Sequence, residues 1–153
     1  MTDRTGKPLI FTKELPGLLG NDERTGIRLI KYHPGNGSFT GHSIVFRYAD
    51  AHLMKAEAIM RGGTSSEDAL TMVNNLRTIR MATPLASVTE QDMLDERGRE
   101  LYAEFWRRND QIRFGKFSEP WQYKTNTDTF RTIYPIPSSA LISNPNLVQN
   151  PGY

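Results

Sequence analysis

The chain has 153 residues, which is long enough for one domain with a hydrophobic core. Its net charge is only +2, and its arginines alternate with acidic residues instead of forming a patch, so nucleic-acid binding is not expected. Cysteine is absent, which excludes disulfides, cysteine nucleophiles and thiolate metal sites, and no apolar run approaches the ~20 residues that span a bilayer.

Residues 1–43 are predicted to be mainly loop. They hold seven of the twelve glycines and three of the nine prolines. Within them, 27–32 is a plausible short strand that ends at the turn-forming stretch 33–37. The first residues have neither signal-peptide character nor a lipid-accepting cysteine, so we expect any membrane anchor to lie outside this segment.

A helix is predicted over 44–61 because apolar residues recur at steps of three and four. One row consists of Phe46, Ala49, Leu53, Ala56 and Met60. A second row consists of Ala51, Met54 and Ala58. A helix with two apolar rows should be buried on two sides and lie between neighbours.

A second helix is predicted over 66–81, after a turn at Gly62 and Gly63. Ser65 with Asp68 could cap its start. Its expected buried residues are Ala69, Met72, Val73, Leu76 and Ile79. Because the connection is short, the two helices should form an antiparallel hairpin of the tetratricopeptide type. A single hairpin leaves faces uncovered, so either the next helix or residues outside this chain should cover them.

The third predicted helix is one long element that starts after Thr89 and has its first plausible stop at Gly115. Thr89 and Asp92 form an acidic variant of the capping box. The apolar residues Leu94, Leu101, Tyr102, Phe105 and Ile112 should share one face. Gly98 lies on that face and should allow another element to approach closely.

Acidic and basic side chains also alternate along 96–113. Glu96, Glu100 and Glu104 each have an arginine three residues away, as expected of a ladder that stabilises a helix by about 0.2–0.5 kcal/mol per exposed pair. A general acid needs a raised pKa, whereas a neighbouring arginine lowers it. The pattern therefore favours a structural role, and we expect no enzymatic activity.

The segment 118–153 is predicted to be irregular, with a short β segment over 130–136 and a proline-rich tail. Its loop carries Trp121 and Tyr123. Aromatic faces stack on the C–H faces of sugar rings, and binding aromatics are often displayed on loops. Trp121 and Tyr123 are thus the candidate ligand-binding residues, although a loop tryptophan can instead pack down as an anchor. Trp106 is expected to be buried between helices.

No metal site or cofactor is expected. The histidines His33, His42 and His52 lack metal-ligand spacing and should have polar or capping roles. The pair Asn126 and Asp128 resembles a fragment of a calcium loop but lacks the further acids, so it should be a turn.

Several motifs resemble the SusD/RagB family in the same order along the chain. They are KY at 31–32, RYADAHLMKAEA at 47–58, VNNLRTIR at 73–80, and ERGREL at 96–101 followed by Glu104, Arg107, Asp110 and RFG at 113–115. The ending, YPIP at 134–137 and NPNLVQNPGY at 144–153, is also similar. Two positions depart from the family's pattern: Phe105 stands where glycine is usual, and Asn109 where an aromatic is common.

This resemblance implies a mainly α fold: a tetratricopeptide-like helical hairpin plus a long helix, with extended loops and minor β segments. It implies one SusD-like C-terminal domain over 1–153, with a helical core at 44–117. It also implies a non-catalytic, lipid-anchored protein on the outer face of the outer membrane. Such proteins capture oligosaccharide or other nutrients for a TonB-dependent transporter.

The resemblance carries no ligand residue onto this sequence, because the matched motifs are structural. The alternative function is a helical-repeat adaptor that binds a protein or peptide. If helices that precede these motifs in the family are absent, the two-sided helix 44–61 should expose an apolar face or bury it in a dimer.

Overall fold

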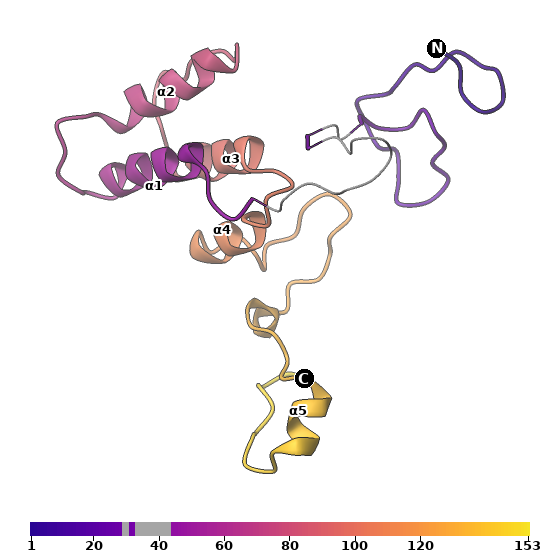
Figure 1. The fold of residues 1–153 in the computed structure, drawn as a ribbon, viewed down its shortest axis with the longest axis vertical. Helices are drawn as coiled ribbons and strands as arrows, with labels where there is room; N and C mark the ends of the chain where they lie inside the picture. Colours follow the sequence, from indigo (N-terminus) through magenta and orange to yellow (C-terminus); the bar gives the residue numbers. More distant parts are fainter. Residues whose placement is uncertain (29–30, 33–43) are drawn as a thin grey trace. The chain divides into compact units, whose positions relative to one another are not determined.

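The computed structural model describes residues 1–28, 31–32 and 44–153. The chain divides into two compact units, Met1–His42 with Pro120–Thr125, and Ser43–Glu119 with Asn126–Tyr153. Figure 1 shows the helices, all of which belong to the second unit. They are α1 (Tyr48–Met60), α2 (Ala69–Ile79), α3 (Glu90–Glu100), α4 (Arg107–Arg113), the 3-10 helix η1 (Thr129–Thr132) and α5 (Ser138–Ser143). The predicted mainly helical class is confirmed, whereas the single domain over 1–153 stays a prediction.

In the first unit, turns and side-chain caps organise the described residues. An isolated antiparallel bridge joins Thr2 and Pro8, and the Asp3 carboxylate accepts hydrogen bonds from the backbone of Thr5 and Lys7. The predicted strand 27–32 is not seen at its ends, since 27–28 are irregular and 31–32 form a turn. Its centre at 29–30, the glycine-rich turn 33–37, His33 and His42 lie outside the described residues.

The predicted hairpin of α1 and α2 is confirmed. α1 ends at Met60. Gly62 follows with a left-handed φ of 99°, and the Gly63 amide donates to the carbonyl of Ala58 at 2.8 Å. Lys55 pairs with Glu67, which lies just before α2 begins. One turn earlier on α1, His52 contacts the carbonyl of Met72, which lies within α2. Contacts that advance along one helix while they recede along the other show that the two are antiparallel.

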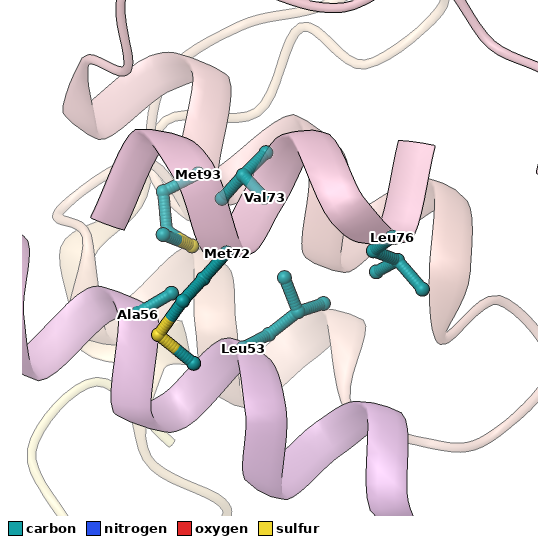
Figure 2. Close-up of a cluster of buried hydrophobic side chains, with 6 residues drawn as sticks. All are labelled: Leu53, Ala56, Met72, Val73, Leu76 and Met93. Carbon is teal, nitrogen blue, oxygen red and sulfur yellow. The ribbon is translucent and has the colours of Figure 1, made fainter. Parts of the chain in front are cut away.

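The core of the second unit lies where α1, α2 and α3 meet (Figure 2). Its buried side chains are Leu53, Ala56, Met72, Val73, Leu76 and Met93. Most of the predicted core is therefore right, but Phe46 and Ile79 are exposed. Both lie at or beyond the helix ends, past the region that a neighbouring helix covers. The predicted Ser65 cap is also wrong: Asp68 is the N-cap and accepts from the Thr71 amide at 2.9 Å.

The second apolar row of α1 is not buried in this structure. Ala51, Met54 and Ala58 are all exposed, although they were expected to face a neighbour. α2 and α3 pack against the opposite side of α1, so the described residues of its own unit cover this row only in part, and Met54 is 44% exposed.

The predicted long helix is wrong in one respect, because it breaks between α3 and α4. The capping box is confirmed: the Asp92 amide donates to the Thr89 hydroxyl at 3.1 Å, and the Thr89 amide donates to Asp92 at 2.9 Å. After Leu101, however, Ala103 and Phe105 adopt φ of 62° and 67°. The break exposes Phe105 and Tyr102 instead of placing them on a shared apolar face.

Ion pairing explains the break. Arg97 and Asp110 are thirteen residues apart and would lie roughly 20 Å apart on a straight helix. In the structure, α4 folds back on α3, and Arg97 Nε donates to Asp110 Oδ2 at 2.9 Å. This pair can form only if the helix breaks. Arg107 likewise reaches back to the Leu94 carbonyl at 2.7 Å and passes over Gly98. The close approach predicted at Gly98 is thus confirmed.

The C-terminal segment is mostly irregular, as predicted, but 130–136 is not a β segment. η1 covers its start and an extended stretch follows. The unpredicted short helix α5 follows Pro137, which has no amide proton to leave unsatisfied at a helix start. The tail packs back through Tyr153, whose ring meets Phe130 edge-on and whose hydroxyl donates to the Ile133 carbonyl.

None of the helices in the described part of the chain is long and apolar enough to cross a membrane.

Candidate functional site

The two predicted ligand-binding residues lie in one tight turn, here called the aromatic turn (121–124). The Lys124 amide donates to the Trp121 carbonyl at 2.8 Å, and the Trp121 amide donates back to the Lys124 carbonyl at 3.1 Å. Tyr123 occupies the third position with φ of 63°, which an L-residue rarely adopts. This paired backbone fixes the direction in which both aromatic side chains leave the chain.

Both rings are well exposed, with 44% of Trp121 and 43% of Tyr123 open to solvent. Two contacts hold them in place. The Tyr123 hydroxyl donates to the Leu15 carbonyl at 2.5 Å, and the Lys124 ammonium lies 4.3 Å from the centroid of the Trp121 ring. The result is a pair of immobilised, half-exposed aromatic side chains, an arrangement suited to stacking on a flat apolar ligand surface such as a sugar ring.

The buried acids of the second unit all form ion pairs with arginines, and several of these pairs join separate helices. All six buried acids among the described residues accept from arginines; they are Asp50, Glu57, Glu96, Glu100, Glu104 and Asp110. At the centre, Arg97 is only 2% exposed and binds Asp50 and Asp110, each at 2.9 Å. The network ties α1 to α3 and α4.

These pairs work against acid–base catalysis. Burial raises the pKa of Glu100, but hydrogen bonds from Arg80 and Arg47 outweigh burial and leave that pKa below its ordinary value. Burial likewise raises the pKa of Glu57, and bonds from Arg113 and Arg61 reverse the effect. A carboxylate held ionised in this way cannot serve as a general acid near neutral pH.

A hollow that the sequence did not predict lies beside α1 and α4. Its volume is about 630 Å³, and its apolar lining is formed by Met54, Ala58, Trp106 and Ile112. Arg97 also lines it, and Arg97 Nη1 and Asp50 Oδ2 are buried without a hydrogen-bond partner. Trp106 is half-buried, not fully covered as expected, and its ring lies tilted against that of Phe46, with the centroids 5.4 Å apart. The second apolar row of α1 was the signal that could have indicated this surface.

The remaining candidates have local structural roles. His52 Nε2 donates to the Met72 carbonyl at 2.9 Å, which is the polar role expected of it. Asn126 and Asp128 bond to each other through backbone and side chain at 2.9 Å, as expected of a turn.

Comparison with known proteins identifies the class. The SusD family model matches residues 19–153, and the chain belongs to this family. The starch-binding protein SusD of Bacteroides thetaiotaomicron is 40% identical over 120 residues, which cover 71% of this chain and 21% of that protein. The SusD-like protein P38 of Formosa agariphila is 35% identical over 143 residues, 83% of this chain and 28% of that protein.

Among solved structures, the surface glycan-binding protein A of Bacteroides uniformis matches with a TM-score of 0.48 and 26% identity. The match covers 71% of this chain and 27% of that one. The chain spans between about a fifth and somewhat more than a quarter of the length of the curated relatives it matches. Of the two readings that the sequence left open, the family model matches the SusD family and not the free-standing adaptor.

Proposed function

We propose that the chain is part of a non-catalytic glycan-binding component of an outer-membrane nutrient-uptake system. The 40% identity to a starch-binding protein supports this proposal most directly. The resemblance described above extends it to a location on the cell-surface face and to a TonB-dependent transporter as partner.

The proposed contact with glycan is the aromatic turn. Trp121 and Tyr123 present two ring surfaces from a backbone that two hydrogen bonds close, so little side-chain freedom is lost when a sugar stacks on them. The six buried acids all accept hydrogen bonds from arginines, and this structural use of the acids supports a binding role without turnover.

Replacement of both aromatics tests this function. The ligand is a starch oligosaccharide, or whichever member of a panel of neutral and anionic polysaccharides the unsubstituted chain binds. We expect the double variant Trp121→Ala with Tyr123→Ala to bind this ligand about tenfold or more weakly. This loss is typical of an anchoring aromatic. Affinity electrophoresis in polysaccharide-containing gels measures the effect.

Tyr134→Ala provides the matched control, because Tyr134 is 69% exposed and lies in the other unit. It should bind glycan as the parent does. An unchanged affinity of the double variant for every polysaccharide that the parent retains would refute the role of the aromatic turn.

We also propose that the exposed apolar row of α1 mediates self-association of this chain. Ala51, Met54 and Ala58 are uncovered, and the neighbouring hollow extends the apolar surface to Trp106 and Ile112. Surfaces of this kind are commonly buried by a partner.

A further inference from the structure

Lys124 covers one face of the Trp121 ring in the aromatic turn. The two residues exchange both backbone hydrogen bonds, at 2.8 and 3.1 Å, so they form a directly opposed antiparallel pair. The side chains of such a pair leave the backbone on the same side, with their Cβ atoms about 4.5–5.5 Å apart. The Lys124 ammonium accordingly lies over the Trp121 ring, 4.3 Å from its centroid.

The rest of the Trp121 side chain remains accessible. Trp121 is 44% exposed, as a ring with one covered and one open face would be. A sugar stacks on an aromatic face through its C–H groups, and a face that already carries an ammonium has no room for this contact. Stacking on Trp121 is therefore restricted to the face opposite Lys124.

We propose that Lys124 is a positioning residue for glycan binding, which holds the Trp121 ring in one orientation and leaves a single face for the sugar. This inference rests on the glycan-binding role proposed above for the aromatic turn. Lysine suits the task because its flexible four-carbon stem can bring the charge over the ring, where the negative face of the ring attracts it.

The Tyr123 ring is held by a different contact. Its hydroxyl donates to the Leu15 carbonyl at 2.5 Å, so another part of the first unit anchors it. Loss of the Lys124 side chain should therefore free the Trp121 ring and leave Tyr123 in place. The loss of glycan affinity should accordingly be smaller than in the double variant of Trp121 and Tyr123.

The motion of the Trp121 ring can be measured directly, because the chain contains only two tryptophans. In a Trp106→Phe background, Trp121 is the single tryptophan, and its time-resolved fluorescence anisotropy should decay mainly with the tumbling of the protein. Lys124→Ala should add a fast component and increase quenching by acrylamide, because the ring gains freedom and a second open face. Lys124→Arg should restore the behaviour of the background, since a guanidinium also stacks on aromatic faces.

Glycan affinity, measured in the same polysaccharide gels, completes the experiment. Lys124→Ala should bind about two- to fivefold more weakly than the Trp106→Phe background, which is the change expected for an exposed contact between a cation and a ring. Lys124→Arg should bind as the background does. Lys13→Ala, which removes an exposed lysine of the same unit, is the control for lost charge and should also leave affinity and anisotropy unchanged.

The outcomes separate this inference from the glycan-binding role itself. An unchanged affinity of Lys124→Ala would overturn the inference, whether or not the ring becomes mobile, and would leave the glycan role intact if the double variant loses binding. Unchanged binding by the double variant would instead refute the glycan role. The anisotropy of Lys124→Ala would then decide by itself whether Lys124 orients the Trp121 ring.

Discussion

At the residue scale, Phe105 is the clearest point of conflict between side chain and backbone. Its φ of 67° lies in the left-handed region, and its side chain is 84% exposed, so its ring gains little from packing. The neighbouring residue, Glu104, forms an ion pair with Arg47, whose Nε lies 2.8 Å from each of its carboxylate oxygens. Ion pairing therefore holds the backbone at this break in a conformation with positive φ. Glycine, which is usual at position 105 in the SusD/RagB pattern, adopts this conformation without a Cβ clash.

We expect Phe105→Gly to raise the free energy of unfolding relative to Phe105→Ala by about 1 kcal/mol. Glycine adopts positive φ without the Cβ clash, and part of this gain is offset by its greater freedom in the unfolded chain. Phe105→Ala is the matched control, since it removes the same ring and keeps the Cβ. Urea denaturation followed by circular dichroism measures both. Equal stability of the two variants would show that φ at this position carries no strain.

At the scale of elements, the Arg97 network decides how α1, α3 and α4 pack. Arg97 and its acids Asp50 and Asp110 are each no more than 2% exposed. A buried ion pair gains less than its Coulomb energy suggests, because both groups lose water. Removal of one partner of such a pair is nevertheless costly, because the charge of the other partner stays buried without compensation.

We therefore expect Arg97→Met to destabilise the chain by about 3–5 kcal/mol, since it removes the arginine that pairs with buried Asp50 and leaves Asp110 with Arg113 alone. Arg99→Met is the control: Arg99 is largely exposed, and its partner Glu96 keeps its bond from Arg77. The control should cost less than about 1 kcal/mol. Urea midpoints measure both changes. A similar small loss in the two variants would mean that the Arg97 cluster does not join the helices.

At the scale of the whole molecule, the same pairs set the response to pH. Glu57 and Glu100 have folded-state pKa values below those of an ordinary glutamate. Between the ordinary and the lowered pKa, the unfolded chain binds more protons than the folded one. Stability from these groups is thus complete above the ordinary pKa and is lost as the pH falls through the folded pKa.

The urea midpoint should accordingly fall as the pH is lowered from about 6 to about 3. Glu100→Gln should show a shallower fall, because one of the linked carboxylates is gone, even though this variant starts from lower stability at neutral pH. Asn75→Ala, on an exposed residue of α2 that has no ionisable group, should keep the slope of the parent. If Glu100→Gln and the parent had the same slope, Glu100 would not contribute to the linkage.

Much of the local structure was determined by the sequence itself. The capping box at Thr89, the hairpin around Gly62 and Gly63, and the core positions of α1 and α2 depend on hydrogen bonds and periodicities within a few residues, so they could be predicted. The motifs also identified the family, which the family model confirmed over 19–153. Trp121 and Tyr123 could be proposed because of their residue type and their position in a loop.

Only the tertiary structure decided where the long helix breaks and which face of α1 stays open. Residues 101–106 contain neither glycine nor proline, so no local signal stops the helix there. The break arises because Arg97 and Arg47 draw Asp110 and Glu104 back across α3, and such pairings join residues distant in sequence. The sequence of α1 shows two apolar rows. Which row is covered depends on how many helices pack around α1, and the sequence of α1 alone does not determine that number.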